Sequence, residues 1–155
     1  MSERHIANET KSTVSVEDYD LGSNPGHLLR RAQQVGVATF SKIVGMDIRP
    51  RQFALMITVS KRPGLHQVDY MRDVGMDRST ISDVVERLEK RGFLERRKED
   101  GDDRTANLYV TTKGQEAIDQ TLPFVRKMEQ ELRNKVPEHL QAPFIEALKA
   151  IAESD

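Results

Sequence analysis

Residues 76–97, MDRSTISDVVERLEKRGFLERR, decide the fold because they combine a helix start, an apolar repeat and a glycine stop. The apolar residues recur three and four positions apart, and at about 100° per residue they fall on one face of an α-helix. Asp77 is placed to cap the start of this helix, and Gly92 follows its end. The segment therefore predicts an amphipathic helix over residues 78–91. Its expected buried face consists of Ile81, Val84, Val85 and Leu88.

The segments on either side predict a helix-turn-helix followed by a β-hairpin. Residues 66–74 are typical of a short helix, which a glycine-containing turn joins to the helix of residues 78–91. Residues 92–98 and 106–111 are rich in β-forming side chains, and the sequence EDGDDRT between them is typical of a turn. The expected fold class is mainly α with a small β-hairpin, an α+β arrangement.

Further helices flank this module on both sides. Residues 26–45 have the broad apolar face of a helix packed on two sides, and Pro50 is placed to open the next helix. Thr111 or Thr112 is placed to cap a long helix, and a last helix follows Pro137. The apolar stripe of the last helix consists of Leu140, Phe144, Leu148 and Ile151. Such stripes need either the core of the same chain or a second copy to cover them.

The composition excludes several classes of site. The chain has no cysteine, so it has no disulfide and no thiolate metal site, and we expect no cofactor. No stretch is apolar enough to cross a bilayer, and the start of the chain lacks the apolar region of a signal peptide, so we expect a cytoplasmic protein. The net charge is −1, but residues 21–114 carry 17 basic and 12 acidic side chains, a balance of +5. The middle of the chain therefore has the charge that favours phosphate.

The polar face of the helix over residues 78–91 carries groups suited to DNA. Hydroxyls, an arginine and the exposed amides of its first turn suit phosphate and base-edge contacts in a major groove. Basic side chains of the hairpin can reach the backbone or an adjacent, narrower groove. The candidate contacts to double-stranded DNA are Arg78, Ser79, Thr80, Ser82, Asp83 and Arg87 on the helix, and Arg96, Arg97 and Arg104 on the hairpin. A polar face that only meets water is the alternative for such a helix.

Taken together, three segments resemble the MarR family of bacterial transcription regulators. They are DRSTISDVVERLEKRG at residues 77–92, DDR at residues 102–104 and LYVTTKG at residues 108–114. The resemblance implies a winged helix-turn-helix in a helical homodimer, with residues 78–91 as the recognition helix. It also implies that Arg104 is the wing arginine and that Asp103, the acid beside it, orients basic side chains.

The resemblance further implies a division of the chain and a mode of action. Residues 1–22 lie outside the resemblance, and their polar, acidic composition without periodicity predicts a flexible arm. For the rest, we expect a dimerisation helix over residues 23–49, the DNA-binding domain over residues 50–113 and dimerisation helices over residues 114–155. A regulator of this kind is implied to be a homodimeric repressor that binds a palindromic operator and is released by a small ligand. The recognition helices of the dimer would enter successive major grooves roughly 34–36 Å apart.

One residue departs from the family's pattern. Many members have a basic or amide residue on the recognition face where this chain has Asp83. An aspartate can accept a hydrogen bond from cytosine N4, or it can pair with Arg87 and aim that side chain.

Candidate effector contacts lie on the first two predicted helices. His27, Arg30 and Arg31 suit a carboxylate or phosphate, and Phe40, Phe53 and Met56 suit an apolar wall. A core or surface role is the alternative for each of these residues. Together they favour a small aromatic acid, or its CoA thioester, as the effector.

Three other functions compete with this interpretation. An enzyme is disfavoured because the sequence has no nucleophile elbow, no phosphate loop and no cysteine, and its histidines are scattered. A helical protein-interaction module without DNA predicts that Arg78 and Arg104 are dispensable. A DNA-binding regulator without a small-molecule effector is the third alternative.

Overall fold

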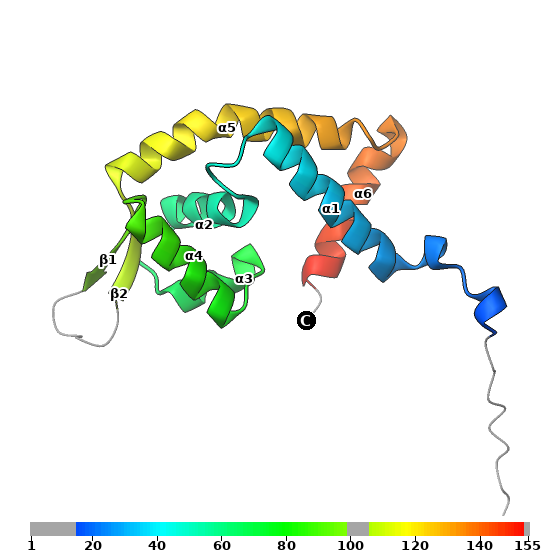
Figure 1. The fold of residues 1–155 in the computed structure, drawn as a ribbon, viewed down its shortest axis with the longest axis horizontal. Coiled ribbons are helices and arrows are strands. Elements are labelled where there is room, and N and C mark those ends of the chain that lie inside the picture. Colours follow the sequence, from blue (N-terminus) through cyan, green and yellow to red (C-terminus); the bar gives the residue numbers. More distant parts are fainter. Residues whose placement is uncertain (1–14, 99–105, 154–155) are drawn as a thin grey trace, which may run out of the picture. The chain divides into compact units, whose positions relative to one another are not determined.

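The computed structural model describes residues 15–98 and 106–153. By internal packing the chain divides into two units, Met1–Gln34 and Val35–Asp155. The elements follow in the order η1 (Val16–Asp18), η2 (Leu21–Ser23), α1 (Pro25–Ile43), α2 (Pro50–Lys61), η3 (Gln67–Tyr70), α3 (Met71–Val74), α4 (Arg78–Lys90), β1 (Leu94–Lys98), β2 (Ala106–Val110), α5 (Thr112–Arg133) and α6 (Glu138–Glu153) (Figure 1). The predicted class, mainly α with a two-stranded hairpin, is confirmed.

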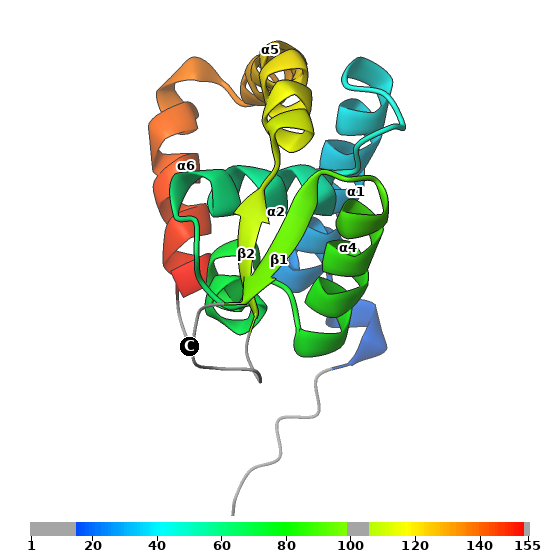
Figure 2. The same ribbon diagram turned by 90° about the vertical axis from the view of Figure 1, so that its left-hand side faces the viewer.

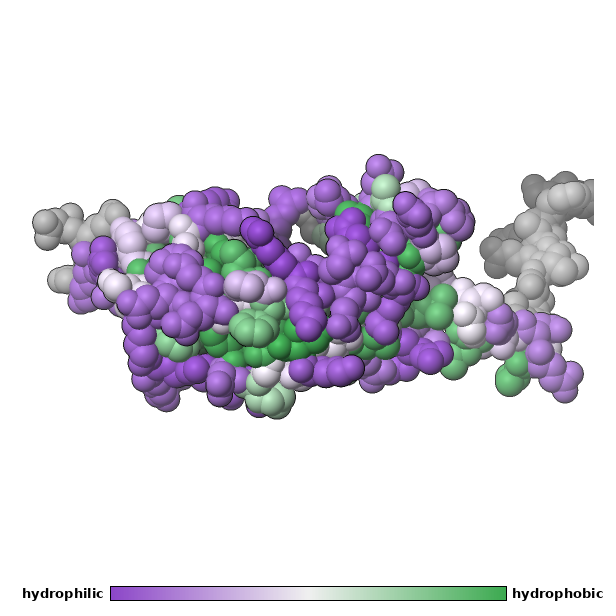
Figure 3. All heavy atoms as spheres, turned by 90° about the horizontal axis from the view of Figure 1, so that it is seen from above, coloured by the Kyte–Doolittle hydropathy of each residue, from purple (hydrophilic) through white to green (hydrophobic). Residues whose placement is uncertain are grey.

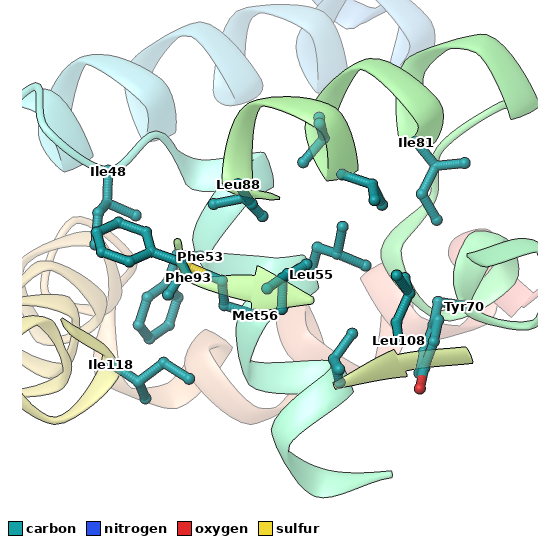
Figure 4. Close-up of a cluster of buried hydrophobic side chains, with 14 of the residues drawn as sticks. Ile48, Phe53, Leu55, Met56, Tyr70, Ile81, Leu88, Phe93, Leu108 and Ile118 are labelled. Atoms are coloured by element: carbon teal, nitrogen blue, oxygen red, sulfur yellow. The ribbon is translucent and has the colours of Figure 1, made fainter. Parts of the chain in front are cut away.

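A single apolar cluster holds the second unit together. Side chains from α2, α4, the hairpin and α5 point toward one another in it (Figure 4). Helix α2 is central, because it contacts α3, α4, α5 and β2. The predicted buried face of α4 is confirmed, since Ile81, Val84, Val85 and Leu88 are its buried residues. Burying a side chain of this size contributes roughly 1.5–3 kcal/mol, so this face fixes the rotation of α4 about its axis.

Both ends of α4 are closed by local hydrogen bonds. At the start, Asp77 Oδ1 accepts from the backbone N–H of Thr80 at 2.7 Å, which confirms the predicted cap. At the end, the N–H of Gly92 donates to Glu89 O at 2.8 Å and that of Phe93 donates to Leu88 O at 2.9 Å. This double closure needs a left-handed residue, and Gly92 has a φ of 74°. Because this closure uses Gly92 and Phe93, β1 begins at Leu94 rather than at the predicted residue 92.

The antiparallel hairpin lies beside α4 (Figure 2). Its register pairs Leu94 with Val110 and Arg96 with Leu108. Leu65 extends the sheet by one bridge, because it accepts a hydrogen bond from the N–H of Leu108 at 2.9 Å. The segment before α3 is therefore attached directly to the hairpin.

The predicted helix over residues 66–74 is a 3-10 turn, η3, followed by the single α-turn of α3. Tyr70, at the junction, is fully buried. Its hydroxyl donates to Arg62 O at 2.6 Å and accepts from the N–H of Leu65 at 3.2 Å, and burial raises the pKa of this phenol. Both partners lie earlier in the chain, so these two hydrogen bonds hold the junction of η3 and α3 against the preceding loop. Helical periodicity does not register such contacts, and it therefore predicts one continuous helix.

The hairpin leads directly into α5. Thr111 caps α5, because its Oγ1 accepts from the N–H of Gly114 at 2.9 Å. The sequence predicted either Thr111 or Thr112 as this cap. The same hydroxyl donates to Gly92 O at 2.6 Å, which joins the end of α4 to the start of α5. Gly114 is buried, and a Cβ built on it would lie 2.1 Å from the carbonyl oxygen of Phe93. Only glycine allows this close approach of helix and strand.

Two classes of feature are missing from residues 15–98 and 106–153. No helix there is long and apolar enough to span a membrane. No group of three or more histidine, aspartate or glutamate side chains there could hold a metal ion.

Replacing Gly114 by alanine should destabilise the second unit. The added methyl group meets backbone, which cannot move aside as a side chain would, so we expect a loss of about 1–3 kcal/mol in the free energy of unfolding. Urea unfolding followed by circular dichroism measures this loss. The matched control is Glu116→Ala, an exposed position in the same turn, which should change stability by less than about 0.5 kcal/mol. Equal effects of the two variants would contradict the close approach.

The cap of α4 should titrate. The pKa of Asp77 is lowered, chiefly by the N–H of Thr80 and next by the Ser79 hydroxyl. The stabilisation is therefore complete above the ordinary carboxyl pKa and is lost as pH falls through the lowered value. Asp77→Ala should lower the urea midpoint at neutral pH, and its difference from wild type should shrink in acid. Asp77→Asn, which still caps but does not ionise, is the control. A difference between wild type and the alanine variant that stays constant down to the lowest pH would contradict this account.

Candidate nucleic-acid interface

The face of α4 opposite the core carries the residues predicted to contact DNA. Arg78, Ser79, Asp83 and Arg87 are exposed, whereas Thr80 and Ser82 are half-buried. Ser79 and Asp83 lie two positions from Ile81 and therefore turn outward in a helix. Arg78 lies three positions before Ile81, so it stands at the start of the helix, at the edge of this face. The structure therefore brings the predicted helix residues together on one surface.

Several charges on this face are available to a ligand. Within residues 15–98 and 106–153, the side chains of Arg78, Asp83 and Arg87 make no hydrogen bond or ion pair. The alternative in which Asp83 pairs with Arg87 is thus not seen. Glu86, one turn further along, is engaged with Lys90 at 2.6 Å.

Arg96 is held by its own chain. Its Nη1 lies 2.9 Å from Glu89 Oε2 on α4, and its Nη2 donates to Gln67 Oε1 at 3.0 Å. The other end of the Gln67 amide, Nε2, donates to Ser82 Oγ at 2.8 Å. The hairpin, α4 and η3 are therefore joined by one chain of polar contacts, which runs from Glu89 to Ser82.

Gln67 and Glu89 were not among the residues predicted from the sequence. The contacts of Gln67 join positions 15 and 29 residues apart, and Glu89 pairs with Arg96 across the turn between α4 and β1, so no helical or strand spacing signals them. Gln67, the first residue of η3, is half-buried and carries no local signal that sequence reasoning could use.

Arg97 also has partners within the hairpin. Its Nε donates to Glu95 Oε1 at 2.8 Å, and its guanidinium lies 4.5 Å from the centre of the Tyr109 ring. This stacking holds the charge on the exposed side of β1. Arg104 and Asp103, predicted as the wing arginine and its orienting acid, lie outside the described residues.

A second group of cations lies where α4 ends. The guanidinium of Arg91 is 4.5 Å from the centre of the Phe93 ring and donates to Asp47 O. Lys113 Nζ is 5.4 Å from the same ring and donates to Arg91 O at 2.8 Å. Arg91 and Lys113 therefore make contacts within the chain that join three segments: the end of α4, the start of α5 and the loop that precedes α2.

The predicted effector residues fall into two sets. In the first unit, His27 Nδ1 lies 3.4 Å from Arg30 Nη2, and both Arg30 and Arg31 are exposed. In the second unit, Phe40, Phe53 and Met56 are buried members of the hydrophobic core. Their packing is the core role that was the alternative to an effector wall.

Comparison with known proteins agrees with this geometry. Residues 48–106 match the MarR family. The HTH-type transcriptional regulator YdcH of Bacillus subtilis is 31% identical over 121 residues, which cover 70% of this chain and 77% of YdcH. The HTH-type transcriptional repressor NicR of Pseudomonas putida is 27% identical over 111 residues, 71% of this chain and 70% of NicR.

Among solved structures, the PcaV transcriptional regulator of Streptomyces coelicolor, crystallised with its natural ligand, is similar over nearly its whole length. The TM-score is 0.82 at 31% identity, and the match covers 88% of this chain and 96% of PcaV. These matches agree with the features described above, which are the order of elements and the polar face of α4 beside a hairpin. The chain belongs to the MarR family, whose members are transcriptional regulators and not enzymes.

Proposed function

We propose that this regulator is a homodimeric repressor that binds a palindromic operator and is released by a small aromatic acid or its CoA thioester. The observation that carries the DNA-binding part is the polar face of α4, which presents unpaired charges beside a hairpin while its opposite face is locked in the core. A helix with this presentation suits a major groove, and the adjacent hairpin suits the backbone next to it.

The proposed contacts divide by chemistry. Arg78 and Arg87 supply positive charge to phosphates, because their side chains have no internal partner among the described residues. Ser79, Thr80 and Ser82 supply hydroxyls near the helix start, and Asp83 accepts from a base amino group. On the hairpin, we propose Arg97 and Arg104 as contacts with the backbone or an adjacent groove, and Asp103 as the acid that orients Arg104.

The apolar surface of the C-terminal helices supports a dimer. No side chain of α6, from Glu138 to Glu153, is buried. Three of its large apolar side chains are 46%, 41% and 52% exposed, namely Leu140, Phe144 and Ile151. Hydrophobic side chains are visible at the surface among hydrophilic ones (Figure 3). Apolar area of this kind calls for a partner surface. We propose residues 23–49 and 114–155 as the dimerisation segments.

The effector proposal rests on the first unit. Arg30 and Arg31 are exposed cations on α1, and His27 lies beside Arg30. A carboxylate is the natural partner of such a cluster. PcaV, at 31% identity, was crystallised with a natural ligand, which supports ligand control here. We assign no effector contact to Phe40, Phe53 or Met56, because their packing in the core accounts for them.

Titration of the DNA upstream of the chain's own gene tests the proposal. The full chain should bind this duplex selectively as a dimer at two salt concentrations, with unrelated DNA as competitor, and the affinity should fall with salt as phosphate contacts require. Adding a panel of aromatic acids and their CoA thioesters should weaken the binding. Weak binding that vanishes with salt and shows no preference for the duplex would contradict the proposal and favour a protein-interaction module. Selective binding that no compound changes would favour a regulator without an effector.

Asp83 should set base preference rather than affinity for phosphate. Because its carboxylate is exposed and unpaired among the described residues, Asp83→Ala should change the preferred base at one position of each half-site by roughly 1–3 kcal/mol and leave the salt slope unchanged. Arg87→Ala, one turn away, is the matched control and should reduce the salt slope by about one for each half-site while keeping the preference. Selection from a library of randomised duplexes measures both quantities. An unaltered preference in the Asp83 variant would rule out its role.

A further inference from the structure

The polar chain from Glu89 to Ser82 has a fixed direction. A carboxylate only accepts hydrogen bonds and a guanidinium only donates them, so Arg96 donates to both of its partners. The Gln67 atom that faces Arg96 must therefore be the oxygen, and its amino group must face Ser82. It follows that Ser82 Oγ accepts from Gln67 Nε2 at 2.8 Å.

This direction leaves the Ser82 proton unused. A serine hydroxyl has one proton to donate, and within the described part of the chain no acceptor takes that of Ser82. The side chain lies on the half-buried edge of the polar face of α4, next to exposed Asp83. Ser82 therefore presents a donor to whatever binds this face.

Ser79 has the opposite polarity. Its hydroxyl donates to Asp77 Oδ1 at 2.9 Å. The lowered pKa of Asp77 keeps that carboxyl ionised at neutral pH, so it can only accept. The Ser79 proton is used, and only its lone pairs face outward. Two serines one helical turn apart thus offer different groups to a ligand.

We propose that Gln67 and Arg96 are positioning residues that hold the Ser82 hydroxyl as a hydrogen-bond donor to an acceptor of the bound DNA. The acceptor is either a base edge, such as purine N7, guanine O6 or thymine O4, or a phosphate oxygen. The inference rests on the proposed DNA-binding function and assigns Arg96 to orientation of the helix surface rather than to phosphate. Ser79 is the complementary acceptor on the same helix.

The test removes one acceptor of the DNA at a time. Wild-type full chain first selects a high-affinity duplex from a randomised library. Single 7-deazapurine, 2-aminopurine and 5-methyl-2-pyrimidinone substitutions then delete N7, O6 and O4 in turn, and methylphosphonates replace phosphates. Loss of one neutral hydrogen bond should weaken wild-type binding about 2- to 10-fold per half-site at the matching acceptor. Ser82→Ala should bind natural DNA more weakly than wild type by the same factor. The analogue that lacks the matching acceptor should not weaken the binding of this variant any further.

Gln67→Glu is the decisive variant because it reverses the direction of the hydrogen bond between residue 67 and Ser82. A carboxylate at position 67 accepts from Arg96 and also from the Ser82 hydroxyl, so the donor is turned inward. Its added charge weakens binding to all duplexes alike and cancels in the ratio of natural to substituted DNA. That ratio should fall to about one at the acceptor identified with Ser82→Ala. Arg96→Lys, which can still donate to Gln67, should retain part of the ratio.

Ser79→Ala is the matched control and should keep the wild-type ratio at that acceptor, since its proton is already bound to Asp77. Circular dichroism of each variant checks the fold. The inference is overturned if no acceptor deletion couples to Ser82→Ala, or if Gln67→Glu keeps the wild-type ratio. The failure of wild type to select any duplex would instead overturn the proposed function, and this inference with it.

Discussion

The burial of one face of α4 is the constraint on which the rest of the interface depends. Ile81, Val85 and Leu88 are 0% exposed, and turning the helix by one residue, about 100°, would bring such side chains into water. At roughly 1.5–3 kcal/mol for each, no contact on the polar side could compensate for that rotation. The direction in which Asp83 and Arg87 point is therefore determined by the core. A substitution in the core that tilts α4 would therefore move the residues proposed to contact DNA, although none of them is itself changed.

The second constraint is the set of contacts that join the end of α4 directly to the start of α5. Gly92 closes α4, and Thr111 donates to its carbonyl while capping α5. Gly114 brings the first turn of α5 against the Phe93 carbonyl. Because each of these contacts involves backbone atoms, the start of α5 has little freedom to move independently of the end of α4. A displacement of α5 would thus be transmitted to the recognition surface through packed backbone rather than through a flexible loop.

Local signals account for what the sequence could predict. The apolar face of α4 and the caps Asp77 and Thr111 depend on residues within a few positions of each other, and the structure confirms them. Two features were not predicted. The turns η1 and η2 are three residues each, too short to carry an apolar repeat, although the side chains of Ser15 and Asp20 cap them locally. The contact of Gln67 with Arg96 and Ser82 requires the tertiary fold to bring η3, α4 and β1 together, so no spacing along the chain announces it.

The distribution of paired and unpaired charge explains how a chain of net charge −1 can present a surface for DNA. Much of the basic charge in α4 and β1 is neutralised internally: Lys90 by Glu86, Arg96 by Glu89 and Arg97 by Glu95. Arg78 and Arg87 are left without such a partner among the described residues. Under the proposed function, these two side chains are the cations of α4 that are free to meet phosphate. The fixed orientation of the polar face then decides which groups of the helix can reach base edges, because the buried face allows no other rotation of α4.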